Sequence, residues 1–148
     1  MGAYQTIVVG TDGSDTSLRA VDRAAELARD CDATLLIAYA PQNGKSLAQE
    51  QDILGADAAY QVVGSTPAED TVRRARDRAL AAGAPHVKTI VVQGKPADTL
   101  QQVVREHSAD LLVVGNRGLN TLAGRILGSV PLDVARHTPV DVLIVHTT

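Results

Sequence analysis

Apolar residues fall into five short runs along the chain, with amphipathic segments between them. The runs span residues 4–10 (YQTIVVG), 33–40 (ATLLIAYA), 87–93 (VKTIVVQ), 110–115 (DLLVVG) and 140–146 (VDVLIVH). They are rich in Val, Ile and Leu and do not alternate with polar residues, which is typical of strands that are buried on both faces. We therefore expect them to form the strands of one parallel sheet.

The segments between these runs carry the period and the end signals of helices. Ser14 is placed to cap the first helix, whose apolar face repeats at helical spacing. That face consists of Leu18, Val21, Ala24, Ala25 and Ala28. Further helices are predicted over 67–82, 96–107 and 130–137. Alternating strands and helices predict an α/β fold, a doubly wound, Rossmann-like parallel sheet with helices on both faces.

One connection interrupts this alternation. Residues 41–66 link the second strand to the second helix and are long for such a link, as lids and binding loops often are. A short helical piece is expected at 46–59. No internal repeat or domain boundary is apparent, so residues 1–148 are predicted to form a single domain.

Composition and charge exclude several partners. Hydrophobic residues make up 45% of the chain, which contains three tyrosines and no phenylalanine or tryptophan. Such a chain offers no aromatic platform for single-stranded nucleic acid, and its net charge of −3 gives no attraction to nucleic acids or anionic membranes. The single Cys31 and the absence of a long apolar run lead us to expect a cytoplasmic protein.

Glycine-rich segments follow the first and the fourth predicted strands. These are GTDGSDTS at residues 10–17 and GNRGLNTLAGRILGSVP at residues 115–131. In a doubly wound sheet, ligands bind beyond the carboxyl ends of the strands, where neighbouring connections run to opposite faces. If the first strand is central, with the second and fourth beside it, both segments border that crevice.

The second segment suits an anion. Gly115, Gly118 and Gly128 let a ligand approach the main chain, and no acidic residue lies between 115 and 131. Ser129 is placed to cap the short helix that follows, whose free N–H groups would bind phosphate. The alternative is that Gly118 and Gly124 only serve turns and Ser129 only caps a helix. Asp12 is likewise open to two interpretations: a partner for an adenine amino group or ribose hydroxyl, or a cap for the turn into the first helix.

The spacing Gly-x2-Gly-x9-Gly-Ser, formed by Gly115, Gly118, Gly128 and Ser129, resembles the nucleotide-binding branch of the universal stress protein family. The early aspartate in VVGTDGS and the five-strand pattern agree with this, and the resemblance runs from Ile7 to Val145. It implies strand order 3-2-1-4-5, a homodimer formed through the fifth strand (Val140 to His146), and an adenine nucleotide as ligand, ATP or cyclic AMP. A Mg²⁺ ion would accompany ATP.

The same resemblance assigns the site residue by residue. Those implied around the base and ribose are Gly10, Thr11, Asp12 and Ala40. Those implied at the ribose and first phosphate are Val114, Gly115 and Gly118, with Asn116 and Arg117 between the two glycines. Those implied at the outer phosphates are Gly128, Ser129 and Val130. Gly10 stands where ATP-binding members often carry proline, and Asn116 where serine or threonine is frequent, so the choice of nucleotide stays open.

Other nucleotide motifs fit less well. A P-loop requires a lysine that residues 115–131 lack, and the first strand leads into GTDGSD, not GxGxxG. An adenylating ATP pyrophosphatase would need glycine where Asp12 places a negative charge against the pyrophosphate. The four histidines have no close metal-ligand spacing, and we expect them to be solvated or at strand edges.

Three alternative functions remain. Hydrolysis of ATP needs a positioned water, a base and stabilisation of the γ-phosphate. Arg117 or Arg125 would supply charge, but no base stands near the glycines. A nucleotide sensor or sequestering module in stress signalling is therefore preferred to a slow ATPase. A ligand-free dimeric adaptor is the third option, although such family members generally lack the complete glycine pattern.

Overall fold

The computed structural model describes residues 2–39, 67–116 and 129–147, and for 129–131 the backbone alone. Five strands form one sheet in the order β3-β2-β1-β4-β5, and every neighbouring pair is parallel. The strands are β1 (Thr6–Thr11), β2 (Thr34–Tyr39), β3 (His86–Val91), β4 (Leu111–Gly115) and β5 (Asp141–Val145). The predicted doubly wound sheet and the strand order implied by the family resemblance are both confirmed.

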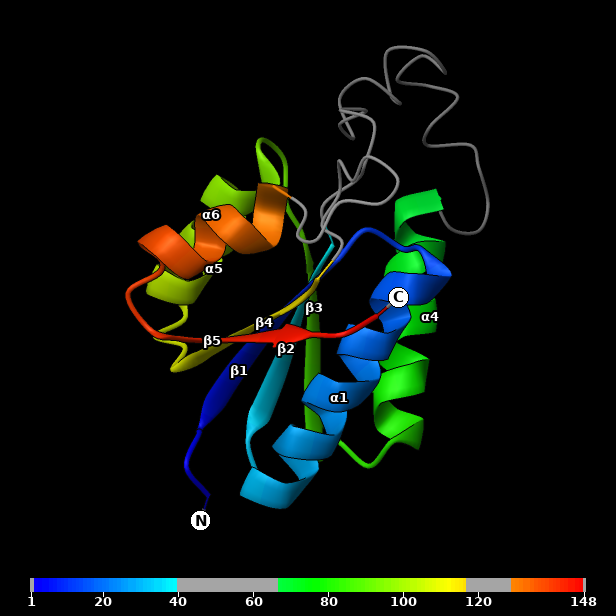
Figure 1. The fold of residues 1–148 in the computed structure, drawn as a ribbon. Coiled ribbons are helices and arrows are strands. Elements are labelled where there is room, and N and C mark those ends of the chain that lie inside the picture. Colours follow the sequence, from blue (N-terminus) through cyan, green and yellow to red (C-terminus); the bar gives the residue numbers. More distant parts are fainter. Residues whose placement is uncertain (1, 40–66, 117–128, 148) are drawn as a thin grey trace.

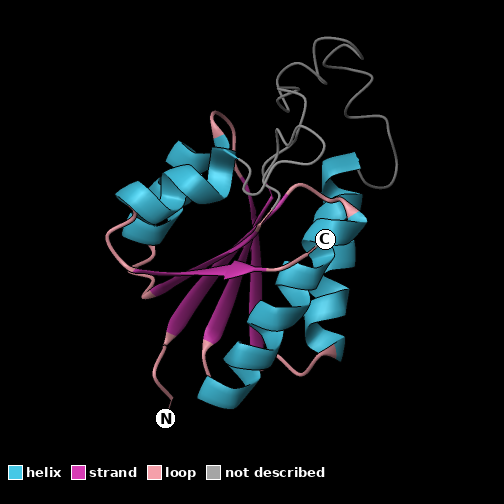
Figure 2. Cartoon of the chain, viewed as in Figure 1, coloured by secondary structure: helices cyan, strands magenta, loops and turns pink. Residues whose placement is uncertain are grey.

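Helices cover both faces of this sheet, as expected (Figure 1). They are α1 (Asp15–Cys31), α4 (Pro67–Ala81), α5 (Pro96–Glu106) and α6 (Ser129–His137). Figure 2 shows α1 and α4 on one face and α5 and α6 on the other. Each face has its own apolar cluster, so successive residues of the central strands point alternately into the α1/α4 layer and the α5/α6 layer.

The helix ends follow from local sequence. Ser14 is the N-cap of α1, as predicted, and its hydroxyl accepts a hydrogen bond from the backbone N–H of Ser17 at 3.2 Å. α1 ends at Asp32, whose φ of 52° places it in the left-handed region. α4 and α5 begin at Pro67 and Pro96, where the missing N–H costs no intrahelical bond.

The strand boundaries differ from the predicted ones by one or two residues at most ends. β1 starts at Thr6, not Tyr4, because the Asp110 carboxylate accepts bonds from the backbone N–H groups of Gln5, at 2.9 Å, and Thr6, at 3.1 Å. It also runs on to Thr11, beyond the predicted end at residue 10. β3 starts at 86 and ends at 91, two residues before its predicted end. The helical piece expected at 46–59 lies outside the described residues.

None of the described helices is long and apolar enough to cross a membrane.

Candidate functional site

The ladder between β1 and β4 ends before either strand does. β1 continues to pair with β2 as far as Thr11, and β4 continues to pair with β5 as far as Gly115. Between β1 and β4, however, the last pair is Val9 with Val113. The final residues of the two strands therefore part from each other, and their main-chain groups on the facing edges are not used by the β1–β4 ladder.

This parting lies at the topological switch point of the sheet. β1 leads into α1 on one face, whereas the connection after β4 leads to α6 on the other (Figure 1). The prediction that the second and fourth strands flank the first is confirmed. Such a point, beyond the carboxyl ends of the strands, is where open α/β sheets bind their ligands.

The turn after β1 is built by hydroxyl groups. The Thr11 side chain is buried, and its Oγ1 accepts a bond from the backbone N–H of Gly13 at 3.1 Å. The same Oγ1 lies 2.6 Å from Oγ of Ser17 in the first turn of α1. These bonds fix the start of α1 against the end of β1. The hydroxyl group of Thr11 is therefore used in hydrogen bonds within the protein.

Asp12 has the turn-forming role that the sequence left open. Its Oδ1 accepts bonds from the backbone N–H of Ser14 at 2.9 Å and from the Ser14 hydroxyl at 2.5 Å. Within residues 2–39, 67–116 and 129–147, no hydrogen bond is made to Oδ2 of Asp12. One carboxylate oxygen thus orders the turn, and the other has no hydrogen bond from the described residues, so a turn-forming role does not exclude a ligand-binding one.

Two glycines beside this turn have neighbouring side chains close to their Cβ positions. A Cβ at Gly10 would lie 2.8 Å from Cδ1 of Leu100, because α5 crosses close to β1. Gly13 has a φ of 85°, and a Cβ there would lie 2.7 Å from Cγ2 of Thr71 and 3.6 Å from Cε1 of Tyr39. Leu100, Thr71 and Tyr39 were absent from the predicted set. The DG dipeptide at 12–13 is a turn signal that would have indicated the left-handed residue.

The end of β4 is held by the C-terminal residues. A Cβ at Gly115 would lie 3.1 Å from Cγ2 and 3.3 Å from Oγ1 of Thr147. Asn116 donates its backbone N–H to the carbonyl of Val145 at 2.9 Å and accepts two bonds from Thr147 at its Oδ1. Thr147 therefore occupies the space next to the missing side chain, which gives packing as a second reason for a glycine at this position, beside the predicted approach of a ligand to its main chain.

α6 begins at the same end of the sheet as the ends of β1 and β4 (Figure 1). Its first turn carries no acidic residue, as the sequence indicated, and its free N–H groups make that end favourable for an anion. Ser129 is the first residue of the helix, one position earlier than predicted, so it lies within the first turn and does not precede it. The residue before it, Gly128, lies outside the described part of the chain.

The remaining predicted residues are described to different extents. Val114 is buried among the apolar residues of the α5/α6 layer, so only its main chain faces the open end of the sheet. Val130 is described through its helical backbone alone. Those outside the described residues are Ala40, Arg117, Gly118 and Gly128.

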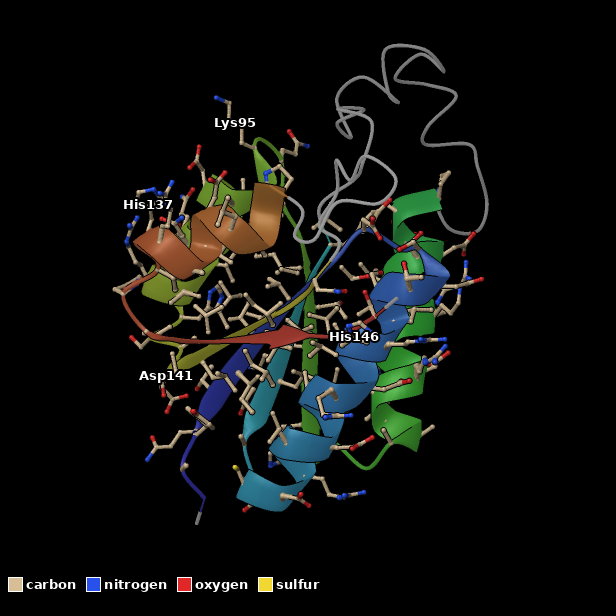
Figure 3. All side chains as sticks on the ribbon, in the orientation of Figure 1. Lys95, His137, Asp141 and His146 are labelled. Atoms are coloured by element: carbon tan, nitrogen blue, oxygen red, sulfur yellow. The ribbon has the colours of Figure 1, made fainter. Side chains whose placement is uncertain are left out.

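All four histidines are exposed, as expected. His137 ends α6 and His146 directly follows β5, and Figure 3 shows them far apart on the molecule. Within the described parts of the chain, no three His, Cys, Asp or Glu side chains are grouped closely enough to hold a metal ion.

The fold places this chain in the class of Rossmann-like α/β proteins with a single parallel sheet. Its strands β1 and β4 part at the switch point, beside the N-terminus of a helix. The family follows from comparison with known proteins. The model of the universal stress protein family matches residues 3–146, and the chain belongs to this family.

Individual relatives agree with this assignment. A universal stress protein of Mycobacterium tuberculosis is 53% identical over 150 aligned positions, which cover all of both chains. The crystal structure of a universal stress protein in complex with cAMP shares 49% identity and a TM-score of 0.76, over 99% of this chain and 100% of that one. A universal stress protein from Archaeoglobus fulgidus in complex with dAMP, at 23% identity and a TM-score of 0.69 over 97% and 98% of the two chains, supports the fold alone.

Proposed function

We propose that this chain binds an adenine nucleotide, cyclic AMP or ATP, where β1 and β4 part, and acts as a nucleotide sensor or sequestering module in stress signalling. The observation that carries the proposal is the early end of the β1–β4 ladder at Val9 and Val113, which leaves main-chain groups of both strands free of that ladder. The cAMP complex of a relative at 49% identity supports an adenine nucleotide as the ligand.

The chemistry of the surrounding groups fits the two ends of such a ligand. Oδ2 of Asp12 is an acceptor of the kind that a ribose hydroxyl or an adenine amino group requires. The first turn of α6 carries no acidic residue and supplies backbone N–H donors at Ser129 and Val130, which suits phosphate. An acceptor in the turn after β1 and donors on α6 would therefore orient the nucleotide across the switch point.

Calorimetry with cyclic AMP, AMP and ATP, the last with and without Mg²⁺, tests this directly. The informative variant is Asp12→Asn, because its amide oxygen still accepts from Ser14 while the carboxylate charge is removed. We expect binding to weaken about tenfold or more, the range expected for loss of a hydrogen bond to a charged group. The stability of the free protein should change by less than about 0.5 kcal/mol.

Asp15→Asn is the matched control. Asp15 is the first residue of α1, and its side chain is 96% exposed, so the substitution makes the same charge change three residues away. We expect affinity to stay within about twofold of the wild type, since an exposed charge is screened by solvent and salt. Equal binding by the wild type and Asp12→Asn would leave Asp12 with its turn-forming role only.

The alternatives have distinct outcomes in the same experiments. Failure of all three nucleotides to bind at low millimolar concentration would favour the ligand-free adaptor. Binding of ATP followed by phosphate release above the protein-free rate would favour the slow ATPase. Neither alternative is supported by a specific contact of the described residues.

We also infer a homodimer formed through β5. This strand lies at one edge of the sheet, and its side chains Val142, Leu143 and Ile144 are only half-buried. Val142→Arg should shift the protein toward monomer in sedimentation velocity, because a charge would then lie on that edge. Val87→Arg, at a half-buried position of the opposite edge strand β3, is the matched control. A dimer that survives Val142→Arg as well as it survives Val87→Arg would exclude β5 as the interface.

A further inference from the structure

The chain that follows β5 is bound back onto the end of β4. We call residues 145–147, the last residue of β5 and the two residues after it, the C-terminal segment; Figure 1 shows it running from β5 toward α1. Oδ1 of Asn116 accepts one bond from the backbone N–H of Thr147 at 3.0 Å and another from the Thr147 hydroxyl at 2.9 Å. The backbone N–H of Asn116 donates to the carbonyl of Val145 at 2.9 Å. Three hydrogen bonds thus join one residue after β4 to the C-terminal segment.

Thr147 is a buried polar residue, only 2% exposed, although it lies outside any strand. Both of its donors are satisfied by the same Asn116 oxygen, and its carbonyl accepts from Nη1 of Arg19 at 3.3 Å. Its methyl group lies against the Cβ position of Gly115. Thr147 is therefore fixed on three sides, and it links the end of β4 to α1, the helix that begins at the Asp12 turn.

These bonds leave Asn116 with little to offer a ligand. Its backbone N–H and its side-chain oxygen are both used within the protein, and its Nδ2 lies 3.4 Å from Nδ1 of His146. Figure 3 labels His146, the residue directly after β5. Asn116 belonged to the nucleotide-binding residues implied by the family resemblance, yet its polar groups face the C-terminal segment.

We propose that Asn116 and Thr147 are positioning residues of the nucleotide site, which fix the end of β4 relative to the Asp12 turn without touching the nucleotide. The inference rests on the proposed function and deepens it. Past Val113, β4 is no longer held by β1, so its last residues depend on β5 and the C-terminal segment for their position. A small displacement there would misplace the main-chain groups that face the ligand.

Thr147→Val is the test substitution. It keeps the shape of the side chain, the methyl group against Gly115 and the backbone bond to Asn116, and removes only the hydroxyl bond. Oδ1 of Asn116 still accepts the backbone N–H of Thr147, so the substitution leaves no acceptor unsatisfied and the variant should still fold. We expect cyclic AMP, measured by calorimetry on the full chain, to bind about three- to tenfold more weakly, the range for one lost hydrogen bond.

Two further variants separate positioning from general stability. Thr147→Ser retains the hydroxyl and should retain affinity within about twofold, which is the rescue expected if the hydrogen bond is what matters. Thr138→Val makes the same change at the other end of β5, where the buried Thr138 hydroxyl has no partner among the described residues. Its affinity should equal that of the wild type.

Hydrogen exchange adds a readout that needs no nucleotide. The Thr147 amide should be protected in the wild type, and Asn116→Ala should remove that protection because its acceptor is gone. If the wild type binds cyclic AMP and Thr147→Val binds equally well, the positioning role is refuted and the proposed function stands. If the wild type binds no adenine nucleotide, the proposed function fails and the positioning role fails with it.

Discussion

Gly115→Ala separates two reasons for a glycine at the end of β4. If the residue is small only to admit a ligand, alanine should fold normally and bind poorly. The structure predicts a different result, because a Cβ at this position would lie 3.1 Å from Cγ2 of Thr147, closer than carbon atoms in ordinary contact. Alanine should therefore displace the C-terminal segment and reduce the stability of the free protein.

The expected loss is the balance of two terms. Forcing one extra methyl group into a packed site costs about 1–3 kcal/mol, and the lower half applies because Thr147 need move only a few tenths of an ångström. Alanine also restricts the unfolded chain more than glycine does, which returns about 0.5–1 kcal/mol. The net destabilisation should be about 1 kcal/mol.

Urea unfolding of a double-mutant cycle measures this value. Thr147→Ser deletes Cγ2, the atom closest to the added Cβ, so the double variant should recover about 0.5 kcal/mol or more relative to additivity. Cyclic AMP affinity is measured on the same four proteins. Additive effects on stability, or a Gly115→Ala protein as stable as the wild type, would show that Thr147 does not set the size of residue 115.

Two further predictions concern other parts of the chain. Asp32→Gly should stabilise the protein by about 0.5 kcal/mol in urea unfolding, because glycine adopts the left-handed conformation, φ 52°, at the end of α1 without steric cost. Asp30→Gly lies within the helix and should instead destabilise the protein. The opposite order of stabilities would refute the left-handed conformation of residue 32. The Tyr4 hydroxyl donates to Oδ2 of Asp141 at 2.9 Å, and this bond, followed by burial, raises the pKa of Tyr4 above its usual value. The folded chain therefore holds the Tyr4 proton to higher pH than the unfolded chain. The stability contributed by this bond is complete below about pH 10 and is lost as the pH rises further. The stability difference between wild type and Tyr4→Phe should be constant from about pH 7 to 9 and shrink above about pH 10, and a difference independent of pH would contradict the bond.

The architecture could be predicted because each element has a strong local signal. Continuous apolar runs indicated strands buried on both faces, and Ser14 and Pro67 marked helix starts that the structure confirms. The ends were less accurate, since a strand stops where its partners stop. β1 begins at Thr6 because a carboxylate more than a hundred positions away accepts the amides of Gln5 and Thr6, and no local pattern contains that information.

The candidate site was predictable in location but less so in the role of each residue. The switch point follows from topology, so the segments after β1 and β4 could be placed there from the sequence. The bonds from Asn116 to Thr147 cross 31 positions and depend on how the chain leaves β5, which sequence periodicity does not specify. Leu100 beside Gly10 is a contact of the same kind.

Strand parity explains why the Cβ position of Gly115 and the first turn of α6 lie on different faces of the sheet. Leu111 and Val113 point into the α1/α4 layer, so the missing side chain of Gly115 also points there, toward Thr147. α6, whose first turn would bind phosphate, covers the opposite face. A nucleotide bound as proposed would therefore meet Gly115 through its peptide groups, from the side of α6. A charged substitution at 115 would disturb the C-terminal segment before it touched the ligand, so loss of binding in such a variant would not identify a contact.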